Sequence, residues 1–309
     1  MVQKKCKKKI FKKEDIPLYM MALPTVVLLI LFNYIPIGGL TLAFKKYNAS
    51  KGIFGSPWNG LKNFEYLFAS SDAFVIVRNT VLYNLIFIFV GTILAVVVAI
   101  LLGEIHSKMT AKVFQTIYIM PFFLSWAVVS IFVDAYLSRS NGLVNHIIQA
   151  MGGEGGVNWY TQINLWPPLL VFIYMWKSVG YNAVVYLAAI SGISQEYYEA
   201  AMLDGANRFQ QARYITIPQL RMIVSLMLIT SMGSIFRGDF GLFHVVTKDT
   251  GALYPVTNVI DTYIYNGMKN QGNVGMTTAA GLFQSIVGFL TLLLANKVVS
   301  KIDADSAMF

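Results

Sequence analysis

The chain has 309 residues, of which 56% are hydrophobic and only 13% are charged, and its net charge is +9. Soluble domains carry about 25% charged residues, so this composition argues against an ordinary soluble protein and favours a membrane protein. The single cysteine, Cys6, excludes a disulfide within the chain and a cysteine-rich metal cluster.

Six apolar runs follow one another along the chain, each long enough to cross a bilayer, which takes about 20 residues. Lipid offers no hydrogen-bond partner to free backbone groups, so we expect each run to be helical and the chain to be an all-α membrane protein. The fifth run is the least regular, because polar residues crowd its far end. The six predicted transmembrane helices are Ile16–Phe44, Thr80–Gly103, Val113–Leu137, Leu165–Ile190, Gln219–Phe236 and Gly275–Lys297.

A basic segment, residues 1–15, precedes the first run and contains seven lysines. The apolar run after it is too long for a cleaved signal peptide, so we expect it to remain as the first span. Six spans put both termini and the loops 104–112 and 191–218 on one side, which holds 14 lysine and arginine residues against 9 on the other. The positive-inside rule places this side in the cytoplasm, which gives an N-in, C-in topology. Much of the net charge is thereby explained without nucleic acid.

The cytoplasmic loop 191–218 contains a spaced pattern of fixed residues. The tripeptide EAA at residues 199–201 is followed after three residues by Gly205, and after nine more by I-T-I-P, which starts at Ile215. This pattern resembles the coupling loop of permease subunits in ATP-binding-cassette (ABC) importers, written EAA-x3-G-x9-I-x-L-P, except that Ile217 replaces the leucine. The resemblance implies a type I ABC importer permease domain over residues 16–309. It also implies that a separate subunit hydrolyses ATP.

The same loop has the local signals of two short helices. Ser194 can cap a first helix through its hydroxyl, and Gly205 can end it in a left-handed conformation. A second helix fits from Asn207 to about Ile215. We expect a helix along the membrane surface that transmits the motion of the ATPase. The residues expected to couple to the ATPase are Glu199, Ala200, Ala201, Asp204 and Gly205.

Beyond this loop, the chain resembles the complex-polysaccharide branch of carbohydrate permeases, the polygalacturonan or rhamnogalacturonan type of Gram-positive bacteria. Members of that branch pair with a second related permease, two copies of a cytosolic ATPase and an extracellular lipid-anchored solute-binding protein. The resemblance therefore implies a heterodimeric sugar permease in the plasma membrane of a Gram-positive bacterium. The segments that carry it are Gly60–Phe64, Arg237–Phe243, Thr257–Tyr263, Gly275–Ser285 and the tail 303–309.

The chemistry of an enzyme is missing from the sequence. No glycine–lysine dipeptide occurs, so the chain has no phosphate-binding P-loop. His106, His146 and His244 stand alone, without the spacing of metal ligands. We expect neither a cofactor nor a catalytic site.

Two groups of residues are candidates for contact with sugar. Tyr174, Lys177, Ser178 and Tyr181 share one face of the fourth predicted helix. Measured from Glu199, they match the sugar-contacting positions of the similar maltose permease. Ser231, Ser234, Ile235 and Gly238 match the contacting positions on the next helix. The residue types differ from those of the maltose permease, so the resemblance locates the site better than it defines its specificity.

The roles of the charged residues near this region stay open. Lys177 either faces a water-filled cavity or extends toward the outer surface. Asp134 is either a partner of Lys177 or Arg237 or a residue at the outer rim. Arg237 and Asp239 either bind substrate or pair with each other. The resemblance and Lys177 both favour uronate-containing or otherwise large oligosaccharides, and neutral glycans remain an alternative.

Three other interpretations compete with a sugar permease. The first is an ABC permease for another solute, such as an amino acid or an oxyanion, against which the aromatic residues of the fourth run argue. The second is a secondary transporter, a class that often contains internal repeats, and no convincing repeat is visible here. The third is a membrane enzyme that acts on lipid-linked sugars, for which the carboxylates are too scattered.

Overall fold

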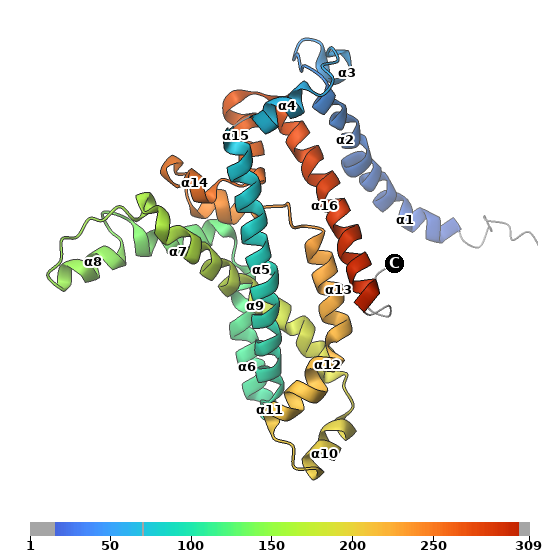
Figure 1. Cartoon of the computed structure of the whole chain (residues 1–309), viewed down its shortest axis with the longest axis vertical. Helices are drawn as coiled ribbons and strands as arrows, with labels where there is room; N and C mark the ends of the chain where they lie inside the picture. Colours follow the sequence, from blue (N-terminus) through green and yellow to red (C-terminus); the bar gives the residue numbers. More distant parts are fainter. Residues whose placement is uncertain (1–15, 70, 303–309) are drawn as a thin grey trace, which may run out of the picture.

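The computed structural model describes residues 16–69 and 71–302, which are nearly all helical (Figure 1). Short 3-10 and π-helical turns join the helices. The α-helices are α1 Ile16–Leu29, α2 Ile35–Ile37, α3 Gly52–Gly55, α4 Lys62–Ala69, α5 Ser71–Gly103, α6 Lys108–Ile119, α7 Trp126–Leu137, α8 Leu143–Ala150, α9 Trp166–Ser191, α10 Gln195–Leu203, α11 Arg208–Gln211, α12 Ile217–Gln219, α13 Arg221–Met232, α14 Tyr254–Thr257, α15 Ile260–Gln271 and α16 Val274–Ile302. The basic segment 1–15 and the tail 303–309 lie outside the described residues.

The structure contains four to six candidate membrane spans. Four helical stretches are long and apolar enough to cross a bilayer by themselves: Ile16–Phe44, Asp72–Gly103, Ile163–Ser191 and Val274–Lys301. Two further spans exist only if helices that meet at a sharp bend are counted together. The predicted first, second, fourth and sixth runs are therefore single long helical stretches, and the third and fifth are not.

The third predicted run, Val113–Leu137, was expected to be one helix but is broken in the middle. The helices on either side of the break, Lys108–Phe123 and Trp126–Leu137, are bent by 95°. Pro121 lacks a backbone N–H and lies in a 3-10 turn where α6 ends. Ser125 then begins α7 as its N-cap, because its Oγ accepts a hydrogen bond from the Val128 N–H at 3.3 Å.

The fifth predicted run, Gln219–Phe236, is also shorter as a helix than expected. Its helix α13 ends at Met232, and residues 233–239 continue as turns and irregular chain before a π-helical segment at Gly241–Val246. Before α13, the stretch Arg208–Gln219 is bent by 58° from it. The polar residues at the end of this run thus mark an interrupted helix rather than its last turn.

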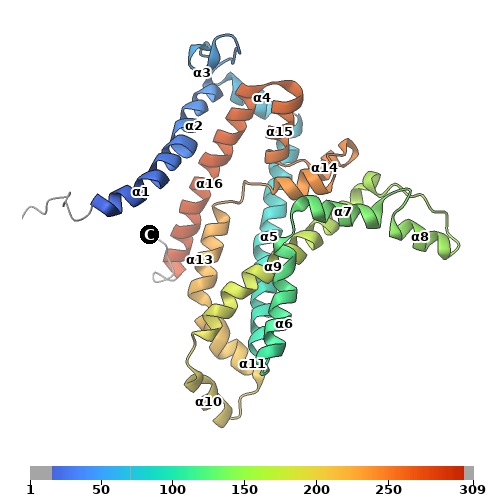
Figure 2. The same ribbon diagram turned by 180° about the vertical axis from the view of Figure 1, so that it is seen from behind.

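The longest helices form a bundle with α5 and α9 at its centre, packed along each other around the buried side chains of Trp166, Leu170 and Tyr186. Helices α13 and α16 pack together beside them. In Figures 1 and 2, α10 and α11 lie at one end of the long axis, and α3, α4 and α15 lie at the other. The two ends of the bundle therefore carry different loops, with the EAA segment at only one of them.

Two parts of the chain extend away from this bundle. The arm formed by α7 and α8 projects to one side, and α1 slants away on the opposite side (Figures 1 and 2). Helix α1 contains no buried residue, although its side chains are strongly apolar. Apolar surface of this extent requires lipid or another protein chain to cover it.

Candidate functional site

A cavity of about 370 Å³ lies where α5, α9 and the end of α13 meet. Four of the predicted sugar-contacting residues line it: Tyr174 from α9, and Ser231, Ser234 and Gly238 from the end of α13 and the segment after it. The other lining residues are Asn84, Phe87, Ile88 and Thr92 of α5, Asn182 of α9, and Thr230, Arg237 and Asp239. The cavity combines aromatic faces with hydroxyl, amide and charged groups, a mixture that suits a polar, ring-shaped ligand.

The other four predicted contact residues do not line this cavity. Ile235 is buried, and the Ser178 Oγ donates to the Tyr174 carbonyl one helical turn away at 2.7 Å. The ring of Tyr181 stacks on Phe122, with a centroid distance of 4.3 Å. In the structure these three side chains contact other residues of the chain rather than the cavity. Their participation in transport stays a prediction.

Lys177 has neither of the two surroundings that the sequence suggested. Its ammonium group donates to the carbonyls of Phe122 at 2.7 Å, Leu124 at 2.5 Å and Pro121 at 3.3 Å. The nitrogen also lies 5.2 Å from the centroid of the Trp126 ring, within the range of a cation–π contact. These carbonyls belong to the break between α6 and α7, so Lys177 supplies the hydrogen bonds that the broken helix lacks.

Asn84 is a cavity residue that the sequence reading missed. Its amide donates to the carbonyls of Ile235 at 2.8 Å and Arg237 at 2.9 Å, and so fixes the unwound segment after α13. Asn84 and Thr92 are polar residues in an otherwise apolar span. Polar residues in a span usually face protein or water, and this signal would have identified both.

The acidic residues near the cavity have partners other than those that the sequence left open as alternatives. Asp134 forms an ion pair with Lys248 at 2.5 Å, not with Lys177 or Arg237. Asp239 accepts a hydrogen bond from the Leu242 N–H at 3.2 Å. Among the described residues, no ion pair joins Asp239 to Arg237. Of the two alternatives for this turn, the pair between Arg237 and Asp239 is therefore not formed in the structure.

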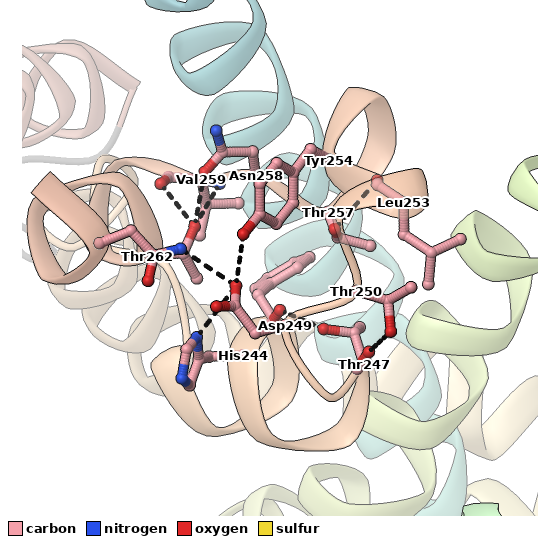
Figure 3. Close-up of polar contacts among 12 residues, drawn as sticks. His244, Thr247, Asp249, Thr250, Leu253, Tyr254, Thr257, Asn258, Val259 and Thr262 are labelled. Carbon is pink, nitrogen blue, oxygen red and sulfur yellow. Dashed lines mark hydrogen bonds and ion pairs between the residues drawn. The ribbon is translucent and has the colours of Figure 1, made fainter. Parts of the chain in front are cut away.

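A polar cluster lies between the Lys248–Asp134 pair and α15. Figure 3 shows the Asp249 carboxylate between the His244 ring and the Tyr254 hydroxyl. Its Oδ1 accepts from Tyr254 at 3.1 Å and from the Asn266 amide at 3.0 Å, and it lies 3.4 Å from His244 Nδ1. Burial and the Asp249 carboxylate both raise the pKa of Tyr254, so its hydroxyl keeps the proton that it donates.

This cluster compensates for an unusual backbone. Lys248 and Asp249 have φ values of 55° and 47°, in the left-handed region that L-residues rarely adopt. Each such residue costs on the order of 1–2 kcal/mol. The two side chains contact different elements, Lys248 reaching α7 and Asp249 reaching α15. The strained turn thus connects the projecting arm to the bundle.

At the opposite end of the molecule, the EAA segment forms helix α10 with the expected boundaries. Ser194 caps it by accepting a hydrogen bond from the Glu196 N–H at 3.4 Å. Gly205 has φ +80° and ends it, with the Ala206 N–H donating back to the Ala201 carbonyl at 2.9 Å. Asn207 then caps the following helix. Both local signals in the sequence are confirmed.

Helix α10 is open to solvent on most of its surface. Glu199, Ala200, Asp204 and Gly205 are exposed, and Ala201 is half-buried. Leu203 is 90% exposed and Phe209 is 73% exposed, which is unusual for such apolar side chains in a folded loop. The ion pair of Arg208 with Glu104, 3.3 Å, joins the region after α10 to the end of α5. An exposed surface is therefore connected to a central helix of the bundle.

Comparison with known proteins identifies relatives over nearly the whole chain. Residues 91–304 match the family model described as binding-protein-dependent transport system inner membrane component. The polygalacturonan/rhamnogalacturonan transport system permease protein YteP of Bacillus subtilis is 32% identical, and the match covers 92% of this chain and 88% of YteP. Protein LplB of the same organism is 31% identical, with 95% of this chain and 91% of LplB covered.

Solved structures give the same result. A chain of a bacterial ABC transporter involved in the import of the acidic polysaccharide alginate matches with a TM-score of 0.84 and 32% identity, covering 94% of this chain and 97% of that one. A chain of a bacterial alginate ABC transporter in complex with an alginate pentasaccharide-bound periplasmic protein matches with a TM-score of 0.83 and 31% identity, covering 94% and 96%.

Proposed function

Because this chain belongs to the family of binding-protein-dependent transport system inner membrane components, we propose that it is the permease subunit of an ABC importer for oligosaccharides. It is a transport subunit and not an enzyme. Its relatives include a permease for polygalacturonan and rhamnogalacturonan and a transporter of alginate. The observation that carries the sugar assignment is the cavity, where aromatic and hydrogen-bonding side chains from three helices meet at an interrupted span.

The proposed topology has six spans with both termini in the cytoplasm of a Gram-positive bacterium. In this arrangement the bent pairs α6 with α7 and α11–α12 with α13 each count as one span. Residues 1–15 form a basic cytoplasmic segment, and residues 16–309 form the permease domain. The exposed face of α10 then lies in the cytoplasm, where a cytosolic ATPase can reach it.

We infer that α10 is the contact with the ATPase. Glu199, Ala200, Ala201, Asp204 and Gly205 lie on a short, capped helix whose apolar neighbours are exposed. Two ATPase subunits, one for each permease, would supply the energy. The Arg208–Glu104 ion pair gives a route by which motion of this loop reaches α5 and the cavity.

The proposed path for the sugar passes Tyr174, Ser231, Ser234 and Gly238 on the cavity wall. Lys177, Ser178, Tyr181 and Ile235 support this wall from behind or take part when the transporter changes conformation. A second, related permease would form the other half of the path and cover the apolar surface of α1. An extracellular lipid-anchored binding protein would deliver the oligosaccharide.

Uptake by the reconstituted transporter tests this proposal. The chain, its partner permease, the ATPase and the binding protein are placed in proteoliposomes, and accumulation of oligogalacturonate and of alginate oligosaccharides is measured with and without ATP. ATP-dependent uptake of either sugar is expected. Uptake of an amino acid or glycerol phosphate, with no uptake of any oligosaccharide, would assign the importer to another solute.

A further inference from the structure

The segment after α13 presents its residues to the cavity while its backbone is not helical. Residues 233–239 are turns and irregular chain, and Ser234, Arg237, Gly238 and Asp239 lie on the cavity wall. Irregular backbone within a membrane is tolerated where it lines a cavity and its polar groups have partners. This segment meets both conditions.

Arg237 is the cation on the cavity wall. Its side chain is exposed there, and among the described residues it forms neither an ion pair nor a side-chain hydrogen bond. Lys177 and Lys248, the nearby cations, are instead held by backbone carbonyls and by Asp134. The Asp239 carboxylate is turned to the Leu242 N–H of its own turn. Arg237 is therefore a cation on the cavity wall whose guanidinium group has no hydrogen-bond or ion-pair partner among the described residues.

The backbone on both sides of Arg237 is fixed by three other helices. Asn84 of α5 donates to the Arg237 carbonyl at 2.9 Å, and Gln284 of α16 donates to the Phe236 carbonyl at 2.6 Å. Asp261 of α15 accepts from the Gly238 N–H at 2.5 Å and from Gln284 at 2.9 Å. The two peptide units that flank Arg237 are thus fixed in place, which sets the direction of its Cα–Cβ bond.

Gly238 permits the close approach that this arrangement needs. A Cβ at this position would lie 2.6 Å from the Val259 Cγ2 atom and 3.2 Å from the Asp261 carboxylate. Burial raises the pKa of Asp261, whereas the Gly238 N–H, Gln284 and the charge of Arg237 act in the opposite direction. The carboxylate is thus stabilised by the same segment that it holds.

We propose that Arg237 binds a carboxylate of an acidic oligosaccharide in the transport path, and that Asp261 and Gln284 are positioning residues that hold Arg237 toward the cavity. The proposal rests on the proposed function of the chain as an oligosaccharide permease. A guanidinium group can bind a carboxylate through two parallel hydrogen bonds, which an uncharged hydroxyl of a neutral sugar cannot match. Arg237 therefore determines specificity for charge.

Uptake of a matched pair of sugars tests the role of Arg237. The probes are oligogalacturonate and its methyl ester, which differ in charge, supplied to the complete transporter with saturating binding protein. We expect Arg237→Gln to lower the ratio of acid uptake to ester uptake by about tenfold, as for the loss of a hydrogen bond to a charged group, and Arg237→Lys to keep part of it. The control Lys269→Gln removes an exposed cation of α15 and leaves the ratio unchanged. Equal loss of both probes in Arg237→Gln overturns the proposal.

A second measurement needs no transported sugar. In the complete transporter carrying Cys6→Ser, the substitution Ser234→Cys places the only cysteine of this chain on the cavity wall. Its modification rates with an anionic and a cationic methanethiosulfonate report the local charge. Arg237→Gln should lower the anionic-to-cationic rate ratio by about fivefold, a change of about 1 kcal/mol. Gln284→Leu, which changes no charge, should lower it partly, and the neighbouring Ser285→Ala should not.

The two measurements separate the two hypotheses. An unchanged labelling ratio in Arg237→Gln means that the guanidinium does not face the cavity, which overturns the inference whatever the substrate is. A changed labelling ratio without uptake of either probe by the unaltered transporter counts against an oligosaccharide as the solute. An unchanged ratio in Gln284→Leu, together with a changed one in Arg237→Gln, removes the positioning role.

Discussion

Lys177 and Arg237 are both cations near the cavity, but their surroundings differ. The Lys177 ammonium donates to three carbonyls at the break of the third span, of which that of Pro121 also accepts from the Leu124 N–H, so its charge stabilises backbone at the break. Arg237 lines the cavity and forms no ion pair among the described residues. A flexible lysine with three donors suits the first position, and a planar fork suits recognition of a carboxylate at the second. This difference supports the proposal that Arg237 selects for charge and leads us to expect a structural role for Lys177.

Replacement of Lys177 should reduce stability rather than change specificity. In Lys177→Met, carbonyls of the helix break lose their donor, and each buried unsatisfied group costs about 1–3 kcal/mol. We expect a lower thermal unfolding midpoint of the purified transporter, with acidic and neutral oligosaccharides affected alike. Lys269→Met, an exposed position on α15, is the control and should leave the midpoint unchanged. A stable Lys177→Met transporter with selective loss of acidic sugars would contradict this assignment.

At the scale of elements, α10 ends in a backbone conformation that only glycine adopts without strain. Gly205 has φ +80°, and no atom lies within 4 Å of where its Cβ would be. Gly152, in the loop after α8, has φ +84° and is equally open. Both glycines therefore need a left-handed backbone and have room for a Cβ. They differ in position, since Gly205 ends the EAA helix and Gly152 lies in a loop of the α7–α8 arm.

Alanine substitutions at these two positions distinguish loss of coupling between α10 and the ATPase from the effect of backbone strain alone. Each substitution costs about 1–2 kcal/mol, because an L-residue must adopt the left-handed backbone conformation. We expect Gly205→Ala to lower uptake by up to about fivefold at constant amounts of transporter in the membrane, because the orientation of α10 changes. Gly152→Ala should leave uptake unaltered. Equal uptake in both variants would argue that α10 does not transmit the stroke of the ATPase.

The elements that the sequence predicts well are those with local causes. The boundaries of α10 follow from Ser194 and Gly205, and four spans follow from long apolar runs. The breaks in the third and fifth spans were not predicted, because their stability depends on contacts between distant parts of the chain. Lys177 stabilises the first break and Asn84 the second, and neither lies close to its break in sequence. Hydropathy alone cannot locate such contacts.

The sequence also predicts the residues of the cavity only in part. Tyr174, Ser231, Ser234 and Gly238 were located by resemblance, whereas the positions on the same helical face as Tyr174 have other contacts. A common face of a helix does not decide what each side chain meets, since α9 packs against both α5 and α6. Asp261 and Gln284, from helices further along the chain, entered the site only through the fold.

For the molecule as a whole, the described part of the chain leaves surface that it cannot cover by itself. Helix α1 buries none of its residues, and α10 exposes Leu203 almost completely. An energy source is also absent, because the sequence contains no P-loop. Both features agree with the family to which the chain belongs, whose members are inner membrane components of binding-protein-dependent transport systems.

The isolated chain should therefore be inactive toward ATP. We expect no ATP hydrolysis by the purified polypeptide in detergent, and hydrolysis only after the ATPase subunits are added. Adding the binding protein and its sugar to the complete transporter should then raise the rate. Hydrolysis by this polypeptide alone, in preparations free of partner subunits, would contradict its role as a permease.

The orientation of the assembly in the membrane can be measured with single cysteines. Leu203 beside the EAA segment is 90% exposed, and Met151 at the end of the α7–α8 arm is 83% exposed. In a Cys6→Ser background, Leu203→Cys and Met151→Cys are each treated with a membrane-impermeant maleimide in intact cells. The positive-inside rule puts the EAA loop in the cytoplasm, so only Met151→Cys should be labelled until the cells are opened. Labelling of Leu203→Cys in intact cells would show that α10 faces the outside. A cytosolic ATPase could then not contact it.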